Sequence, residues 1–287
     1  MKPASAADPT VRRIAVLMTC HNRRPLTLRC LHSLFAATVA VATPTSFDVF
    51  LVDDGCTDGT AEAVSQRFPG VRILPGSGSL FWCGGMRKAW IAAAEGNYDA
   101  YLWLNDDVAL HENALRLLIA TLDHGQLQDG REGIVVGSTL SRESVGVSKT
   151  SYGSMGPAGV EEPGDKARRI ELFNGNIVLV SRGAYRVLGN LSDAYTHALG
   201  DIDYGIRAKQ NDIPVWLAAG HHGTCEGNKT PRWRRPDVPL WTRLYELHRP
   251  TGCPPFQLAR LVWSNGGWYF PWSVLKLYLR ALFPQWI

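Results

Sequence analysis

Short apolar runs alternate with segments of helical spacing through the first 124 residues of this 287-residue chain. The runs at 14–18, 49–52, 71–74 and 100–104 have the length and composition of buried strands. Helices are expected between about residues 26–42, 57–68, 84–95 and 112–122. Strands that alternate with helices form parallel sheets, because each crossover helix returns the chain to the same end of the sheet. The sequence therefore predicts an α/β fold with a Rossmann-like, mostly parallel sheet flanked by helices.

The pattern weakens after residue 124. Strands are predicted at 134–136, 177–180 and 214–218, and helices at 184–188 and 201–211. Residues 141–170 are rich in Gly, Ser, Pro and charge, which is typical of a loop or a hairpin. The chain length lies near the upper limit for one hydrophobic core, so we expect one large domain over 11–228. A flexible tail is expected at 1–10, and a C-terminal helical extension at 229–287.

The charge of the chain is modest and local. Hydrophobic residues make up 45% and charged residues 20%, which is typical of a globular protein rather than a disordered one. The formal net charge of +4 comes largely from Arg232, Arg234, Arg235 and the far C-terminus, and no nucleic-acid motif occurs. The pattern favours an anionic ligand or a membrane surface as a partner, and no nucleic acid.

The six cysteines predict reduced thiols and a cytoplasmic protein. They are scattered without CxxC spacing, and no basic-then-apolar leader opens the chain, so a secreted disulfide framework is not expected. No stretch of about 18 uncharged apolar residues occurs, so no segment is expected to span a bilayer.

Two acidic turns follow apolar runs of the first half. Asp53-Asp54-Gly55 ends the run at 49–52, and Asn105-Asp106-Asp107 ends the run at 100–104. Strand ends of one open sheet face the same crevice, so the two turns are expected to serve one ligand. Carboxylate oxygens suit a hard cation such as Mg2+ or Mn2+, which in turn usually holds a phosphate. The alternative is that both are ordinary turns rich in Asp and Gly.

The known motifs of dinucleotide and nucleotide-triphosphate sites do not fit this chain. A Rossmann dinucleotide site places G-x-G-x-x-G between its first strand and helix. Thr19-Cys-His-Asn-Arg23 stands there instead, and the nearest match, at 76–81, has Phe81 in place of the third glycine. No Walker lysine motif occurs either. The sequence therefore argues against both kinds of site.

Five motifs occur in the order found in family 2 glycosyltransferases. They are Thr19-Cys-His-Asn-Arg23, Val52-Asp-Asp-Gly-Cys-Thr-Asp-Gly-Thr60, Trp82-Cys-Gly-Gly85, Asn105-Asp-Asp107 and Gly200-Asp-Ile-Asp-Tyr204. On these motifs residues 12–228 resemble a GT-A glycosyltransferase, with a nucleotide-binding half at 11–124 and an acceptor half at 125–228. The resemblance implies transfer of a sugar from a nucleoside diphosphate sugar to an acceptor hydroxyl, with inversion at the anomeric carbon.

The resemblance also implies roles for particular residues. The implied nucleotide-binding positions are Thr19, His21, Arg23, Asp53, Asp54 and Asp106. The implied donor-sugar positions are Trp82, Gly84, Gly85 and Asn105, and the implied acceptor positions are Asn174, Asn176 and Asp203. Asp107 and His222 are the implied ligands of Mg2+ or Mn2+, and Asp201 is the implied general base.

Two positions depart from the family pattern. Asn105 stands where the Asp-x-Asp metal motif has its first Asp, which predicts a weak metal requirement. Gly200 stands where a Glu usually precedes the base. Asp203 is the rival of Asp201 as the carboxylate that takes the acceptor proton. On a helix, residues two apart face different directions, so only one of the two carboxylates should point into the crevice.

Aromatic and basic residues pattern the last part of the chain. Trp268 and Trp286 bracket a segment in which Lys276 and Arg280 share one helical face. This is typical of a helix at a membrane interface and favours contact with an anionic membrane; the alternatives are packing on the domain or on a second subunit. The basic segment at 231–236 fits either a lid over the diphosphate or a solvated loop.

The predicted function is an inverting, metal-assisted glycosyltransferase that builds a bacterial cell-surface polysaccharide, such as an O-antigen, at the inner face of the membrane. The motifs at 82–85 and 200–204 resemble rhamnosyltransferase-like members, so a UDP- or dTDP-linked donor and a glycan or lipid-linked acceptor are expected. One alternative, a sugar-phosphate nucleotidyltransferase, would carry a Gly-rich basic loop after the first strand. The other, a non-catalytic nucleotide-sugar-binding protein, is left open by Asn105 and Gly200.

Overall fold

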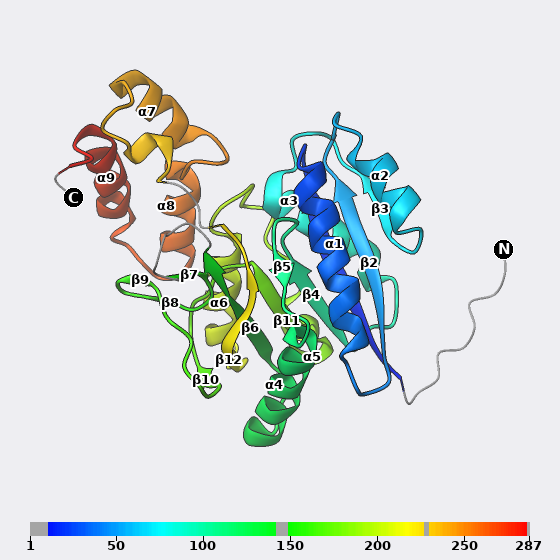
Figure 1. The fold of residues 1–287 in the computed structure, drawn as a ribbon. Coiled ribbons are helices and arrows are strands. Elements are labelled where there is room, and N and C mark those ends of the chain that lie inside the picture. Colours follow the sequence, from blue (N-terminus) through cyan, green and yellow to red (C-terminus); the bar gives the residue numbers. More distant parts are fainter. Residues whose placement is uncertain (1–10, 142–148, 227–229, 286–287) are drawn as a thin grey trace.

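A sheet of mostly parallel strands forms the centre of the protein (Figure 1). The computed structural model describes residues 11–141, 149–226 and 230–285, so the tail expected at 1–10 lies outside the described part. Four parallel strands come from the first half: β1 (Arg12–Cys20), β2 (Thr45–Asp53), β3 (Arg72–Pro75) and β4 (Ala100–Leu104). The sheet continues from β4 through three long strands of the second half: β11 (Ile177–Ser181), β6 (Ile134–Ser141) and β12 (Val215–Thr224).

Among these seven strands, β11 is the exception to the parallel arrangement. It runs antiparallel to both of its neighbours, β4 and β6, whereas β12 is parallel to β6. Short strands lie at the margins: β5 (Ala109–Leu110), β7 (Lys149–Tyr152), β10 (Arg168–Arg169), and the hairpin of β8 (Met155–Gly156) with β9 (Gly159–Val160). The last four of these fall in the stretch predicted as a loop or hairpin, of which residues 142–148 lie outside the described part. The predicted mostly parallel α/β sheet is confirmed.

Helices cover both faces of the sheet, and side chains alternate between the two. One face packs under α1 (Arg24–Val39), α2 (Thr60–Arg67) and α4 (Ala114–Asp129), and the other under α3 (Phe81–Ala94), α5 (Arg182–Leu188) and α6 (Gly200–Gln210). In β1, Val16 joins the first core and Leu17 the second, and both side chains have no exposed surface. A strand buried on both faces is a continuous apolar run, which is why its position could be read from the sequence.

The C-terminal helices form a smaller cluster beside the sheet (Figure 1). They are the 3-10 turn η1 (Arg232–Arg234), α7 (Leu240–His248), α8 (Pro255–Ser264) and α9 (Phe270–Leu282). Their own core consists of four buried residues, Trp233, Leu247, Leu277 and Ala281. Helix α8 joins them to the α/β part, because Leu261 packs with Cys83 and Tyr195. Within the described residues, none of the helices has the length and apolar character needed to cross a bilayer.

Candidate active site

The acidic turns meet at one edge of the sheet, as predicted. β1, β2 and β4 are parallel, so their carboxyl ends lie at the same edge. Cys20 pairs in register with Asp53, and the amide of Asp54 donates to the carbonyl oxygen of Cys20 at 2.9 Å. The turn after β4 reaches the same region, because Arg23, just past β1, contacts Asp106 and Asp107. The first loop and both turns therefore line one edge.

Asp54 is buried and its carboxylate is fully engaged by backbone amides. Oδ1 accepts a hydrogen bond from the amide of Gly78 at 2.8 Å, and Oδ2 accepts from Leu80 at 2.9 Å and Phe81 at 3.0 Å. Gly76 allows this contact, since a Cβ there would lie 2.6 Å from Asp54. Asp54 therefore anchors the loop that leads into α3, in the way a capping residue satisfies the free amides at a helix start.

His21 is tied to the same turn through the backbone. Its Nδ1 lies 2.6 Å from the carbonyl oxygen of Asp54. The carboxylate of Asp53 remains partly exposed, with Oδ1 accepting from the amide of Cys56 at 2.8 Å. Of the two acids in this turn, Asp53 is thus the one whose carboxylate has an open side. Both residues stay predicted nucleotide contacts.

The Asn105-Asp106-Asp107 turn holds two acids in different environments. Asp106 is 5% exposed and accepts from Thr27 at 3.3 Å, and burial raises its pKa to about 7 despite the Arg23 guanidinium at 3.4 Å. Asp107 is partly exposed, and its Oδ2 lies 2.7 Å from Nη1 of Arg23. Arg23 therefore places one fixed positive charge against both acids.

Cys225 contacts Asp107, and this contact was not predicted from the sequence. Cys225 follows β12 directly, and its Sγ donates to Oδ1 of Asp107 at 3.4 Å. Among the described residues, no hydrogen bond or ion pair joins His222 to Asp107. His222 lies within the core with no exposed surface, near Gly137, and neither ring nitrogen has a hydrogen-bond partner in the described part. Burial, with His111 and His221 nearby, lowers the pKa of His222 to about 4.

A chain of close contacts runs from the turn after β4 to the start of α6. The indole Nε1 of Trp82 donates to the side-chain oxygen of Asn105 at 2.7 Å. The ring of Trp82 lies against Gly175, where a Cβ would come within 2.5 Å of it. The amide of Gly175 donates to Oδ2 of Asp201 at 2.8 Å. The structure thus brings the predicted donor-sugar residues Trp82 and Asn105 next to the predicted base.

The remaining predicted residues surround this chain of contacts. Gly85 lies against Thr19, because a Cβ at Gly85 would come within 2.1 Å of the Thr19 hydroxyl. The backbone carbonyl oxygen of Asn176 accepts a hydrogen bond from the backbone amide of Asn105 at 3.1 Å. The side-chain oxygen of Asn174 is buried and has no partner within the described residues. A buried acceptor without a donor is a group that a ligand hydroxyl can satisfy.

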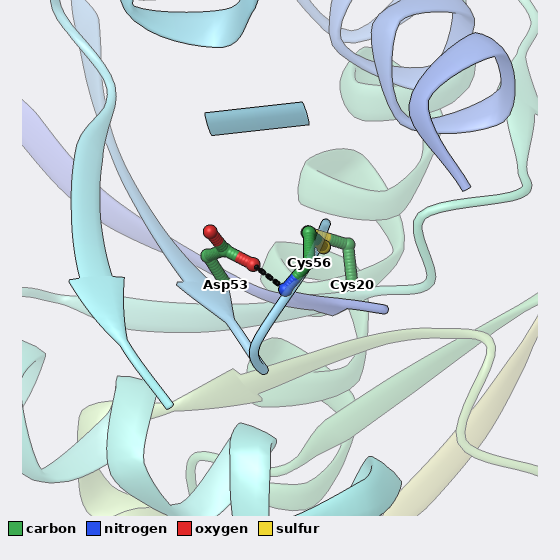
Figure 2. Close-up of side chains that lie close together, drawn as sticks. All are labelled: Cys20, Asp53 and Cys56. Carbon is green, nitrogen blue, oxygen red and sulfur yellow. Dashed lines mark hydrogen bonds between the residues drawn. The ribbon is translucent and has the colours of Figure 1, made fainter. Parts of the chain in front are cut away.

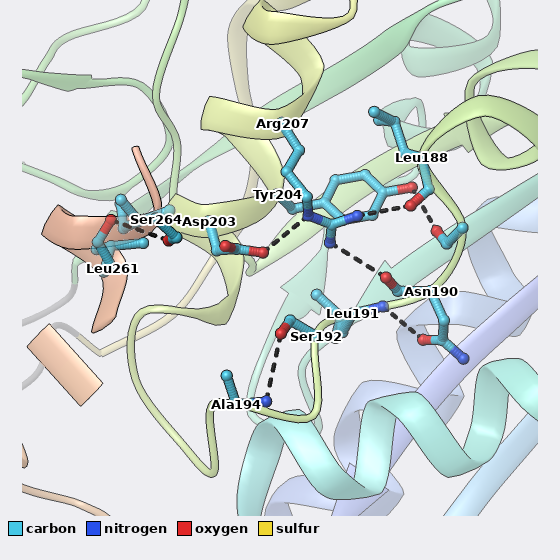
Figure 3. Close-up of polar contacts among 12 residues, drawn as sticks. Leu188, Asn190, Leu191, Ser192, Ala194, Asp203, Tyr204, Arg207, Leu261 and Ser264 are labelled. Atoms are coloured by element: carbon cyan, nitrogen blue, oxygen red, sulfur yellow. Dashed lines mark hydrogen bonds and ion pairs between the residues drawn. The ribbon is translucent and has the colours of Figure 1, made fainter. Parts of the chain in front are cut away.

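Asp201 and Asp203 point in different directions from α6, as the helical spacing predicts. Figure 3 shows Asp203 facing Arg207, with which it forms an ion pair at 2.8 Å. Arg207 also donates to the carbonyl oxygens of Leu188 at 2.6 Å and Asn190 at 3.1 Å. Asp203 therefore stabilises the link between α6 and the segment after α5. Asp201 is partly exposed, and within the described residues it forms no ion pair with a basic side chain; partial burial raises its pKa.

The absence of a Glu before Asp201 has a packing reason. Gly200 lies against Cys83 of α3, and a Cβ at Gly200 would come within 2.5 Å of the Cys83 Sγ. Cys83 has no exposed surface and donates to the carbonyl oxygen of His197 at 3.3 Å, so it has little room to move. A side chain at residue 200 would therefore require the buried Cys83 to shift.

The basic segment proposed as a lid makes local contacts. Arg232 pairs with Glu246 at 3.3 Å, and Arg235 pairs with Asp237. Arg234 lies over the ring of Trp233. These contacts are compatible with either prediction for this segment, and the lid stays a prediction.

The family of the chain follows from comparison with known proteins. The model of the family described as Glycosyl transferase family 2 matches residues 15–184, and the chain belongs to this family. It is similar to N-acetylglucosaminyl-diphospho-decaprenol L-rhamnosyltransferase of Mycobacterium tuberculosis, with 26% identity over 226 residues, 69% of this chain and 73% of that protein. The predicted family and the enzyme class, a glycosyltransferase, are confirmed, and so is the predicted resemblance to a rhamnosyltransferase.

Solved structures confirm the GT-A fold. The mannosyltransferase PcManGT from Pyrobaculum calidifontis, in complex with GDP-Man and Mn2+, aligns with a TM-score of 0.53 at 15% identity, covering 98% of this chain and 89% of that one. S. aureus TarS 1–349 in complex with UDP aligns with a TM-score of 0.54 at 14% identity, covering 92% and 73%.

Proposed function

We propose that this protein is an inverting glycosyltransferase that moves a sugar from a UDP- or dTDP-linked donor to an acceptor hydroxyl during assembly of a bacterial cell-surface polysaccharide. The observation that carries the proposal is the contact of Asp201 with Gly175. It puts a carboxylate that has no basic partner in the described part of the chain beside Trp82, which in turn contacts Asn105. The similarity to an L-rhamnosyltransferase supports rhamnose as the sugar and a lipid-linked glycan as the acceptor.

Asp201 acts as the general base in this proposal. The acceptor oxygen attacks the anomeric carbon, the bond from that carbon to the nucleoside diphosphate breaks, and the hydroxyl proton passes to Asp201. Partial burial raises the pKa of Asp201, which makes its carboxylate a better proton acceptor than a fully solvated one. The amide of Gly175 fixes Oδ2 and leaves the carboxylate in one orientation. The ion pair of Asp203 with Arg207 makes it a poorer candidate.

Nucleotide binding is assigned to the loop after β1 and the two acidic turns. Thr19, His21, Arg23, Asp53, Asp54 and Asp106 keep the roles predicted from the sequence. Arg23 has the most direct role, because its guanidinium faces this edge and can pair with a diphosphate once it leaves Asp107.

The turn at 105–107 offers oxygen ligands, which suit Mg2+ or Mn2+, but few of these oxygens are free to bind an ion. Asp107 offers the exposed carboxylate, whereas Asp106 is buried and the side-chain oxygen of Asn105 accepts the Trp82 indole. Asp107 would therefore hold the ion with few other protein ligands, and His222 would not contribute without moving out of the core. When bound, the ion would neutralise charge on the departing diphosphate. Because Arg23 already supplies a positive charge there, we expect the metal requirement to be weak.

A panel of UDP-, dTDP- and GDP-sugars tests the proposal. Calorimetric binding is measured with Mn2+ and then with EDTA, and transfer to a lipid-linked glycan acceptor is measured for the donor that binds. Selective binding followed by turnover supports the proposal. Binding of a donor without turnover on any acceptor would favour the non-catalytic alternative, and absence of binding across the panel would contradict the nucleotide assignments.

The exposed aromatic residues of the C-terminal helices support a peripheral location at the inner face of the membrane. Trp268 is 81% exposed, Trp272 is 54% exposed, and Lys276 lies over the Trp272 ring at 5.5 Å. Aromatic rings beside basic groups are favoured at the interface of an anionic bilayer. Such contact would bring the active site to a lipid-linked acceptor. Trp286 of the same predicted segment lies outside the described residues.

A further inference from the structure

Two thiols and a carboxylate converge beside the predicted nucleotide site. Figure 2 shows Cys20, at the end of β1, next to Asp53, the last residue of β2, and Cys56 in the turn after β2. The sulfur, sulfur and oxygen atoms all lie within 4.8 Å of one another. Cys20 is buried, whereas Asp53 and Cys56 are partly exposed, so the group is open on one side. We propose that Cys20, Asp53 and Cys56 bind a thiophilic divalent cation such as Zn2+, at a site separate from Asp107.

The sulfur spacing fits one tetrahedral ion. Two thiolates at about 2.3 Å from a tetrahedral Zn2+ lie about 3.8 Å apart. The Sγ atoms of Cys20 and Cys56 are 3.8 Å apart before any ion is added. A thiolate and a carboxylate oxygen on the same ion lie about 3.5 Å apart, so each sulfur-to-oxygen distance, now at most 4.8 Å, needs to shorten by no more than about 1.3 Å. Three protein ligands leave a fourth position open to solvent.

Backbone amides orient two of the three ligands. The amide of Asn22 donates to Sγ of Cys56 at 3.2 Å, and the amide of Cys56 donates to Oδ1 of Asp53 at 2.8 Å. Asn22 has a φ of 52°, in the left-handed region, and the side-chain oxygen of Asn22 accepts the amide of Thr57 at 2.7 Å. Hydrogen bonds to ligand atoms from the surrounding chain are the usual support of a metal site, because they hold the ligands in place.

A disulfide is the competing use of the same two thiols. Its sulfur atoms would have to approach from 3.8 Å to about 2.05 Å. Burial and the neighbouring Cys56 raise the pKa of Cys20, and burial and Asp53 raise the pKa of Cys56, so both thiols react slowly with oxidants. Zn2+ binding instead releases both thiol protons to solvent and needs no oxidant.

Binding of Zn2+ at this site should affect donor binding, an expectation that rests on the proposed function. Asp53 is a predicted nucleotide contact, and an ion on its carboxylate removes that group from the nucleotide. Zn2+ would therefore weaken donor binding while Mg2+ or Mn2+ would not, because hard cations disfavour thiolate ligands.

The first arm of the test measures metal binding without nucleotide. Zn2+ alone is titrated against a chromogenic chelator in the full chain under a phosphine reductant, and Co2+ replaces it to reveal the thiolate-to-cobalt charge-transfer absorption. We expect one ion per chain, and at least about 100-fold weaker binding in Cys56→Ser, since loss of a mere supporting group already costs about 10–100-fold. Cys253→Ser is the matched control, another partly buried free thiol.

The outcomes separate this inference from the proposed function. Absence of stoichiometric Zn2+ binding, or equal binding in wild type and Cys56→Ser, would overturn the site. In the second arm, donor affinity is compared in EDTA and in Zn2+. A Zn2+ effect in wild type and Cys253→Ser that disappears in Cys56→Ser supports the link to the nucleotide turn. Chelation of Zn2+ by the donor itself would persist in Cys56→Ser and would count against that link. Failure of all donors to bind leaves the first arm intact.

Discussion

The α/β part and the C-terminal helices differ in how completely they bury their large aromatic side chains. In the α/β part, strands such as β1 bury residues on both faces of the sheet, and Trp90 and Trp103 have no exposed surface. In the C-terminal helices only a small core is buried, while Trp241 and Trp268 are each 81% exposed. The exposed large side chains of the α/β part, such as Leu127, are aliphatic, whereas the C-terminal helices and their connections expose large aromatic rings. We expect chemistry to depend on the first part and location on the second.

The largest expected effect tests whether chemistry belongs to the α/β part alone. Asp201→Asn should lower transfer by about 100-fold or more with little change in donor affinity, because a missing general base acts on the chemical step. Single-turnover transfer and calorimetric donor binding measure the two quantities.

Asp203→Asn is the matched control for that change. It removes the partner of Arg207 and should cost about 2 kcal/mol of unfolding free energy, measured by urea denaturation, because a partly buried charge loses its pair. Equal transfer in Asp201→Asn and wild type would assign the base elsewhere.

The second effect concerns the imidazole of His222, which is buried in the α/β core, and the pH dependence of stability that its burial predicts. The pKa of His222 falls from the usual 6.5 to about 4, so between these values the unfolded chain binds a proton that the folded protein does not. Stability should therefore fall as the pH drops from 6.5 towards 4. Between pH 7 and 4.5 wild type should lose about 2 kcal/mol more than His222→Leu, measured by urea denaturation.

The same variant tests the predicted metal role of His222. If His222→Leu binds Mn2+ with the donor as wild type does, Asp107 does not need this imidazole. A loss of Mn2+ affinity would show that the histidine leaves the core when the site is loaded.

A smaller effect is expected at the cation position. Asp107→Ala should weaken donor binding by about 10-fold in Mn2+ and change it little in EDTA, since the carboxylate acts through the ion. Calorimetry in both conditions measures the difference, and the same affinity in wild type and variant with Mn2+ would remove the metal role. Arg23→Ala should weaken donor binding in both conditions, because its charge acts without a metal.

The smallest effect tests whether the exposed aromatic residues of the C-terminal helices bind membranes. Replacing Trp268 and Trp272 together by Ala should reduce binding to phosphatidylglycerol-containing vesicles by about fivefold or more, with donor affinity unchanged. Leu127→Ala is the control, because Leu127 is 86% exposed on α4 of the α/β part. Vesicle co-sedimentation measures binding, and equal losses in the two variants would show that apolar exposure as such is responsible.

The features that depend on a local sequence pattern could be predicted. Continuous apolar runs marked β1, β2 and β4, because strands covered on both faces contain few polar residues. The acidic turns were placed at one edge because parallel strands share a direction. Helix α3 begins at Phe81 rather than at Gly84, where it was expected, because the carboxylate of Asp54 accepts hydrogen bonds from the amides of Leu80 and Phe81 at the helix start. That contact joins residues 26 and 27 positions apart.

Long-range packing accounts for what the sequence could not give. The pairing of Arg23 with Asp107 spans 84 residues, and the contact of Cys225 with Asp107 spans 118. His222 follows the family's order along the chain, yet the structure gives it core neighbours. The order of motifs was therefore enough to find the family, and the partners of each side chain required the fold.

The contact between Gly200 and Cys83 makes the order of mutations matter. Gly200→Glu, which restores the family pattern, should be disruptive in this chain, because its Cβ would meet the Cys83 Sγ at 2.5 Å. The same change becomes accessible once residue 83 is Gly. The two positions are thus expected to be an epistatic pair, so a lineage that acquired the cysteine should retain glycine before Asp201 until the cysteine is lost.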